Sequence, residues 1–372
     1  MSAMIPGLPT ELTDRIIDFL WDDAPSLCRC ALTCHTWLPR SHYNLYNSIH
    51  LDTRRSLESL IRASRIRNVE RSLSSVHRLE LQDTKPGWVH RLPLVLGHIL
   101  SDIQELLIEH LDWNGICMHP DTVPFGFMQF GRVTTLSLSG CTFRSPRQFQ
   151  CLVSALTRLN ILKISATVSS AKTAVADTAP APLRLPPLIE VSMDPNVDQP
   201  LVQSLLEWFA CASLKPALRK FQLYSSRNVT PQVRKFLEVV GGVLEDLTLF
   251  LDQSFSTSDL EQLNVRSCVS LRTLGLRGSR AIALEHMLGV IAPSSRIHDL
   301  WLRVNTMESS PNLLSIFEEA RFAELQRFTI STFPQEANAS VTEAVEALCN
   351  RGVCADVSFE YPYVYPRPGG EG

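Results

Sequence analysis

A short apolar pattern recurs along most of the chain at a nearly constant interval, and it constrains the fold more than any other feature. Each copy has three apolar positions, separated by two residues and then by one residue, as in Val133, Leu136 and Leu138. The middle position recurs about every 28 residues, at 49, 79, 106, 136, 162, 191, 221, 247, 274, 300, 328 and 357. An interval of this size is typical of stacked repeats, in which each unit buries its apolar face against its neighbours.

Each repeat is predicted to hold one strand and one helix. The last two apolar positions alternate as in a short strand with one buried face, and the roughly 20 residues that follow usually contain a helix. Ser145, Thr230 and Ser310 each precede a proline, as an N-cap hydroxyl does at a helix start. Ser340 and Glu343 have the spacing of a capping box. The sequence therefore predicts an α/β fold of about twelve strand-turn-helix repeats.

Over residues 48–360 the chain resembles leucine-rich repeats of the longer, strand-plus-helix kind. That family keeps Asn, Cys or Thr five residues after the middle apolar position, where a short polar side chain satisfies backbone groups at the turn. Eight copies have such a residue here: Thr84, Cys141, Thr167, Asn196, Ser226, Asp252, Ser279 and Asn305. The resemblance implies an irregular horseshoe-shaped solenoid over 48–360.

Two segments depart from the repeat pattern. Residues 165–187 are rich in Ala, Ser, Thr and Pro and have almost no apolar face, which predicts a loose loop. Residues 361–372 contain three prolines and a pair of glycines, which predicts a flexible tail.

Residues 1–47 lie outside the repeats and resemble an F-box, with an opening Leu-Pro pair, an apolar helical stripe and a later tryptophan. The residues that carry the resemblance are Leu8, Pro9, Leu12, Ile16, Phe19, Leu20, Leu27, Cys30, Cys34 and Trp37. The resemblance implies a small three-helix domain that docks on the Skp-type adaptor of a cullin-RING ubiquitin ligase. The residues expected to contact the adaptor are Leu8, Pro9, Leu12, Ile16, Leu20 and Leu27.

Charge and targeting signals restrict the partners. The net charge is -3, so no overall positive field favours nucleic acid or an anionic membrane. The N-terminus lacks a signal peptide and no apolar run is long enough to span a bilayer, which predicts cytoplasmic or nuclear residence or both. The ten cysteines are expected to be reduced.

Sequence motifs for catalysis are absent. The chain has no GxSxG, HExxH, GxGxxG or GxxxxGK[ST] pattern, so no enzymatic activity and no cofactor are predicted. Cys28, Cys30, Cys34 and His35 lie close together, but their spacing matches no common zinc motif, and no metal site is predicted.

The strand residues that alternate away from the core should line the concave face. In the C-terminal half these positions include aromatic and arginine residues, the types that dominate protein-binding hot spots. The predicted target-binding residues are Tyr224, Phe250, Arg277, Trp301 and Arg303. An alternative for Phe250 and Trp301 is packing beneath a capping segment.

These features together predict the substrate receptor of an SCF-type ubiquitin ligase. The F-box-like domain would bind the adaptor and the repeats would hold an unidentified target protein, so the receptor acts by proximity. The alternative is a leucine-rich-repeat interaction scaffold that works outside a ubiquitin ligase.

Overall fold

The computed structural model describes most of the chain in two compact units, Met1–Pro186 and Pro187–Gly372. The division falls inside the repeat array, so the helical N-terminus and the first five repeats share one unit. The described residues are 9–66, 69, 72–74, 76–82, 88–89, 92–113, 122–169, 183–211, 217–225, 227–251, 255–306, 313–332 and 339–359.

The first unit begins with three short helices. They are α1 (Thr10–Asp18), α2 (Ala24–Thr33) and α3 (Leu38–Asn47). Ile17 of α1 and Leu27 of α2 are buried and form the apolar centre of this small bundle. A bundle with so few buried side chains needs additional links between its helices.

A charged contact supplies one such link. The Arg40 guanidinium on α3 donates two hydrogen bonds to the Asp18 carboxylate on α1, each 2.6 Å long. Asn44 also donates its side-chain amide to the carbonyl of Ile17, at 3.2 Å. The hydrogen bond from Arg40 holds the pKa of Asp18 below its usual value. These contacts fix the end of α1 against α3.

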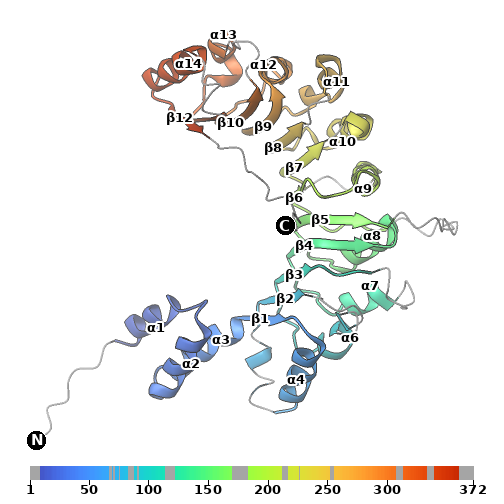
Figure 1. The fold of residues 1–372 in the computed structure, drawn as a ribbon, viewed down its shortest axis with the longest axis vertical. Coiled ribbons are helices and arrows are strands. Elements are labelled where there is room, and N and C mark those ends of the chain that lie inside the picture. Colours follow the sequence, from blue (N-terminus) through green and yellow to red (C-terminus); the bar gives the residue numbers. More distant parts are fainter. Residues whose placement is uncertain are drawn as a thin grey trace, which may run out of the picture. The chain divides into compact units, whose positions relative to one another are not determined.

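Five parallel strands follow in the first unit (Figure 1). They are β1 (Ser48–Leu51), β2 (Arg78–Gln82), β3 (Glu105–Glu109), β4 (Thr135–Phe143) and β5 (Ile161–Val168). The helices that the structure describes in full between them are α4 (Arg54–Ser64), α6 (Leu92–Leu96), α7 (Thr122–Phe127) and α8 (Pro146–Ala155).

The second unit contains seven parallel strands with helices along one side (Figure 1). The strands are β6 (Glu190–Met193), β7 (Lys220–Ser225), β8 (Asp246–Leu251), β9 (Thr273–Arg280), β10 (Asp299–Thr306), β11 (Arg327–Thr332) and β12 (Cys354–Phe359). The α-helices are α9 (Gln199–Cys211), α10 (Thr230–Val240), α11 (Thr257–Gln262), α12 (Ala281–Val290), α13 (Leu313–Phe317) and α14 (Ala339–Asn350). The described part of this unit also contains the 3-10 turns η2 (Arg227–Val229), η3 (Val265–Ser267) and η4 (Ala320–Phe322).

The strand register confirms the predicted repeat. Leu136 pairs with Leu162, and Phe221 pairs with Leu247, so equivalent apolar positions meet on neighbouring strands. The prediction is wrong for the last copy, because Phe328 pairs with Ala355 and Val357 lies two residues further along β12. The fold is that of a leucine-rich-repeat protein.

Helix α10 illustrates how a repeat is packed. Its buried apolar residues are Val233, Phe236, Leu237 and Val240, which recur at the spacing of one face of the helix. The Phe236 ring lies 4.5 Å from the ring of Phe221 on β7, centroid to centroid. The strand and its helix thus bury their apolar faces against each other.

The predicted helix starts are confirmed in part. Ser145 caps α8, since its hydroxyl accepts a hydrogen bond from the backbone N–H of Gln148 at 3.3 Å. Thr230 is instead the first residue of α10, which begins without a side-chain cap. Ser340 lies inside α14 rather than before it. Ser310 lies outside the described residues.

The short polar residues predicted five positions after the middle apolar residue are buried in some repeats and exposed in others. Cys141 is buried and its thiol donates to the carbonyl of Ile108, at 3.4 Å. Thr167 and Asn196 are exposed, so the expected internal position is wrong for them. The β4–β5 pairing is irregular between Ser139 and Cys141, so Cys141 pairs with Ala166 rather than with Thr167.

The expected loop at 165–187 starts later than predicted. Strand β5 continues to Val168, where its residues pair with β4. Residues 183–189 form neither helix nor strand, while 170–182 and the expected tail at 361–372 lie outside the described residues. In the part of the chain that the structure describes, no helix is both long and apolar enough to cross a membrane.

Candidate functional site

The face of the second unit's strands that points away from the helices is called the open face here. Tyr224, Phe250 and Arg277 occupy equivalent positions on β7, β8 and β9, and Arg303 follows on β10. Trp301 lies two residues before Arg303 on the same strand. The register therefore brings all five predicted target-binding residues to neighbouring positions.

The aromatic members of this group contact one another. The rings of Tyr224 and Phe250 are stacked, with centroids 3.8 Å apart and planes 4° apart. The ring of Trp301 lies 6.3 Å from that of Phe250, inclined by 60°. All three side chains keep part of their surface exposed. They form an apolar surface that crosses four strands.

Arg277 joins the aromatic group to a positive charge. Its guanidinium carbon lies 5.7 Å from the centroid of Phe250, within the range of a cation–π contact. One guanidinium nitrogen also donates to the hydroxyl of Tyr224, at 3.4 Å. We call Tyr224, Phe250, Arg277 and Trp301 the open-face cluster.

Gly275 lies on the strand between the rings of Phe250 and Trp301, and a role for it was not predicted from the sequence. It lies on β9 between Thr248 of β8 and Trp301 of β10, so it separates the strands of Phe250 and Trp301. A Cβ atom built at Gly275 would lie 2.8 Å from the Thr248 hydroxyl. Gly275 thus places no side chain on the strand that separates Trp301 from Phe250, whose rings lie 6.3 Å apart. A glycine inside a strand is the sequence signal for such a close approach.

Charged residues border the cluster at the starts of the strands. Lys220 lies between Glu190, at 3.7 Å, and Asp246, at 3.9 Å. Burial raises the pKa of Asp246, and the nearby Lys220 opposes that shift. Arg327 donates to both oxygens of Asp299, at 2.6 and 2.9 Å, which lowers the pKa of Asp299. These ion pairs link the carboxylates to neighbouring strands.

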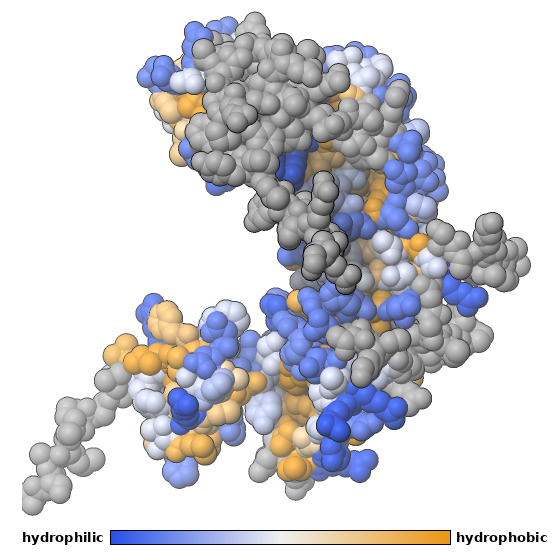
Figure 2. All heavy atoms as spheres, viewed as in Figure 1, coloured by the Kyte–Doolittle hydropathy of each residue, from blue (hydrophilic) through white to orange (hydrophobic). Residues whose placement is uncertain are grey.

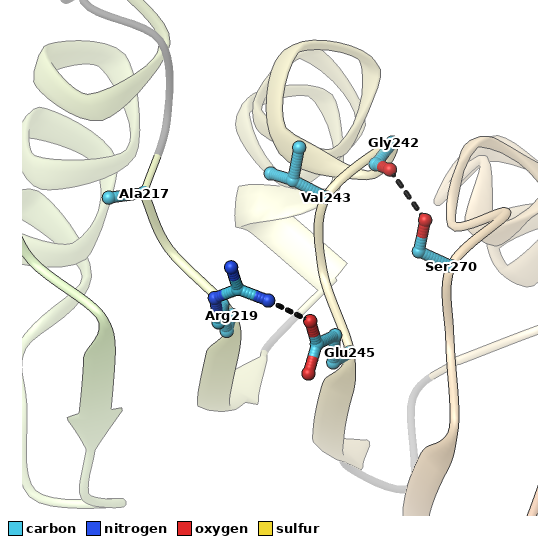
Figure 3. Close-up of a pocket in the computed structure, with 6 residues that line it drawn as sticks. All are labelled: Ala217, Arg219, Gly242, Val243, Glu245 and Ser270. Carbon is cyan, nitrogen blue, oxygen red and sulfur yellow. Dashed lines mark hydrogen bonds and ion pairs between the residues drawn. The ribbon is translucent and has the colours of Figure 1, made fainter.

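A pocket of about 260 Å³ lies near the start of β7 and β8 (Figure 3). Arg219 and Glu245 form an ion pair across it, and the Ser270 hydroxyl donates to the carbonyl of Gly242 at 2.7 Å. The remaining lining residues are Ala217 and Val243. Its polar groups thus bond to one another, and we assign it no ligand.

The helical N-terminus offers a second exposed apolar surface. Leu12 and Ile16 on α1 are 51% and 50% exposed, and Pro9 before them is also exposed. Leu20 is half-buried, and Leu8 lies outside the described residues. Leu27 is only 1% exposed, so its assignment to the adaptor-binding face is wrong: the side chain fills the centre of the helical bundle.

Three further apolar residues on this surface were not predicted as contacts. Phe19 is 77% exposed, Trp21 is also exposed, and Leu32 on α2 is 87% exposed. Figure 2 shows apolar side chains gathered over α1 and α2. Large apolar residues that remain in water beside one another mark an interaction surface. We call Leu12, Ile16, Phe19 and Trp21 the α1 patch.

The cysteine cluster of the N-terminus has no metal-site geometry. Cys28 and Cys34 are exposed free thiols on and after α2. A hydrogen bond with the Thr36 hydroxyl, 3.0 Å away, lowers the pKa of Cys34. Across the described ranges, no three His, Cys, Asp or Glu side chains are grouped as metal ligands would be.

Comparison with solved structures finds a weak similarity of fold. No protein-family model matches the chain, and no curated protein matches it. Among solved structures, the crystal structure of a TLR13–ssRNA13 complex is 13% identical, with a TM-score of 0.38. The alignment covers 79% of this chain and 43% of that chain, so this chain spans less than half of that protein's length. Nothing about a ligand follows from a likeness at this level.

Proposed function

We propose that the protein is the substrate receptor of an SCF-type cullin-RING ubiquitin ligase. In this proposal the α1 patch docks on a Skp-type adaptor, and the open-face cluster binds a target protein. The receptor itself performs no chemistry, because it acts by holding its target near the transferring enzyme.

The observation that carries the proposal is the α1 patch. Its residues lie on a helical bundle that the F-box resemblance identifies, and Leu12 and Ile16 share one helical face. Leaving such side chains in water forfeits roughly 25 cal/mol for each Å² of apolar surface that a partner could cover. A binding partner on this surface explains why it is apolar.

The link between the bundle and the repeats supports a receptor with two binding ends. The carbonyl of Asn47 at the end of α3 accepts a hydrogen bond from the N–H of His77, at 3.0 Å. The rings of Tyr43 and His77 lie 6.4 Å apart. The bundle is thus attached to the second repeat as well as to the first strand.

Affinity purification of the full chain tests the adaptor end. Leu12→Asp together with Ile16→Asp places two carboxylates in the proposed apolar interface, which costs several kcal/mol without compensating partners. We expect the Skp-type adaptor to be lost from this variant and retained by the wild type.

Thr10→Asp is the matched control. Thr10 is exposed and lies two residues before Leu12, so it points about 200° away around α1. The control should retain the adaptor. Equal recovery of the adaptor by all three proteins would refute the docking surface.

The alternative function is an interaction scaffold that works without an adaptor. The inward position of Leu27 favours it, because one expected contact is missing from the docking face. The scaffold would use the same open-face cluster. Two results together would identify a scaffold: the wild type does not bind the adaptor, and its target binding depends on the open-face cluster.

A further inference from the structure

Arg277 in the open-face cluster is a cation without an anionic partner. Its guanidinium donates one hydrogen bond to the neutral hydroxyl of Tyr224, at 3.4 Å, and lies 5.7 Å from the centroid of the Phe250 ring. In the described part of the chain, no ion pair joins Arg277 to a carboxylate. Asp194, which follows the end of β6, is three strand spacings from β9, about 14 Å. The two contacts hold the guanidinium in place and occupy only one of its five N–H groups.

Asp246 supplies the opposite charge at the other end of the same face. Arg277 lies four residues beyond the position that pairs with Asp246, about 13 Å along the strands. The Asp246 side chain is 26% exposed, and its ion pair is with Lys220 at 3.9 Å. Lys220 also pairs with Glu190, at 3.7 Å, so two carboxylates share one ammonium group. A net negative charge therefore remains at the starts of β6, β7 and β8.

The surface between these two charges is apolar. Trp301 pairs with Gly275, which lies midway between the row of Asp246 and the row of Arg277. The Trp301 ring is partly exposed, and its centroid lies 6.3 Å from that of Phe250. In an extended peptide, every second side chain is on one face, and residues four apart on that face are about 13 Å apart. Such a peptide thus matches the spacing of the two charges and of the apolar surface between them.

The charges favour a protein segment over a nucleic acid. Aromatic and arginine side chains also stack on the bases of single-stranded nucleic acids. A nucleic acid has a negative charge on every nucleotide, so the incompletely paired carboxylate of Asp246 would repel it. The net charge of the whole chain is also negative, at -3. A ligand with one charge of each sign is complementary to both ends of the surface.

We propose that the open face binds an extended peptide segment with an acidic and a basic residue four positions apart and an apolar residue midway between them. The carboxylate of the acidic residue bonds to Arg277, the apolar side chain lies on Trp301, and the cation of the basic residue bonds to Asp246. Hydrogen bonds between charged partners are about twice as strong as neutral ones. This inference rests on the part of the proposed function in which the open-face cluster holds a target protein, and it specifies the class of target.

Peptide display on the purified full chain tests this specificity. Random, unmodified peptides of about ten residues are long enough to cross the open face when extended. Selection on the wild type should enrich an acidic and a basic residue four positions apart. For a synthetic peptide of that class, Arg277→Glu should raise the Kd at least about tenfold. Exchanging the acidic residue of the peptide for lysine should restore binding to this variant, which also shows that the variant is folded.

Two further variants test the charge at each end separately. Arg266→Glu makes the same charge change at an exposed position on η3, outside the open face, and should leave the Kd unchanged. Asp246→Asn should raise the Kd of the selected peptide about tenfold. It should not change the Kd of a peptide in which alanine replaces the basic residue.

Three results on the peptides would each overturn the proposal: no enrichment, enrichment of peptides without an acidic residue, or equal Kd values for the wild type and Arg277→Glu. Displacement of the peptide by a single-stranded oligouridine would also overturn it, because a nucleic acid would then occupy the surface. The adaptor is absent from these measurements. Loss of the predicted peptide specificity with retained adaptor binding would refute this inference alone, and the converse result would refute the ligase proposal alone.

Discussion

Gly275 gives the sharpest test of how the open-face cluster is built. In Gly275→Ala the new Cβ would lie 2.8 Å from the Thr248 hydroxyl and 3.0 Å from its methyl group. Forcing an extra carbon into a filled site costs about 1–3 kcal/mol. Replacing glycine stabilises by about 0.4–1 kcal/mol through the unfolded chain. We therefore expect a net loss of about 1 kcal/mol in the free energy of unfolding.

The cost of Gly275→Ala should shrink when Thr248 is shortened. In Thr248→Ala the two closest atoms are absent, and the remaining contact at 3.3 Å is with Cβ. Gly275→Ala should then cost about 1 kcal/mol less than it does beside Thr248, because the entropic gain is opposed only by this milder contact. Urea unfolding of the wild type, both single variants and the double variant measures this coupling.

A stabilising Gly275→Ala in both backgrounds would refute the reasoning. It would mean that the space above β9 is open and that the approach of Trp301 to Phe250 does not require glycine. Tryptophan emission of the single variant provides a second readout, since a displaced Trp301 ring would change its environment.

Three further changes test the contacts that hold the structure together. Leu27→Ala should destabilise the helical bundle by about 2–5 kcal/mol, because removing the buried side chain leaves a cavity. Leu32→Ala, at an exposed site, should change the stability by no more than about 0.5 kcal/mol. Thermal melting of the two variants compares these effects. Ser145→Ala should cost about 1 kcal/mol through loss of the α8 cap, measured by urea unfolding, and an unchanged midpoint would show that the cap is dispensable. The pKa of Asp18 is lower in the folded protein, so the stability from its pair with Arg40 is present above the unfolded-state pKa and is lost as the pH falls through the folded value. Asp18→Asn should make the free energy of unfolding depend less on pH in the acid range. A pH dependence identical to that of the wild type would contradict the contribution of the Asp18–Arg40 pair.

The repeat register was predictable because alternation and a fixed interval together determine which apolar residues meet. The last copy shows the limit of this logic. Val353, just before β12, and Ala355 and Val357 within it are spaced two residues apart, so a two-residue slip leaves the same face apolar and the pattern cannot choose between the registers. The structure selects Ala355, a residue whose small size gave a weak signal.

The candidate site was predictable only where it follows from the register. Tyr224, Phe250 and Arg277 occupy one row because their strands pair in order. The role of Gly275 depends on a threonine on the next strand, which no pattern within β9 reveals. The burial of Leu27 depends on how three short helices pack, because each helix has too few turns for its apolar stripe to be unambiguous.

Direct assembly with a purified Skp-type adaptor tests the central claim, that the N-terminal bundle is a docking module. The full chain is mixed with the adaptor, and the mass of the product is measured by light scattering during size-exclusion chromatography. We predict a one-to-one complex for the wild type. Leu12→Asp with Ile16→Asp should weaken binding at least about 100-fold, since several kcal/mol are lost at tenfold per 1.4 kcal/mol. Absence of a complex with the folded wild-type chain, or a complex that survives both substitutions, would contradict this account.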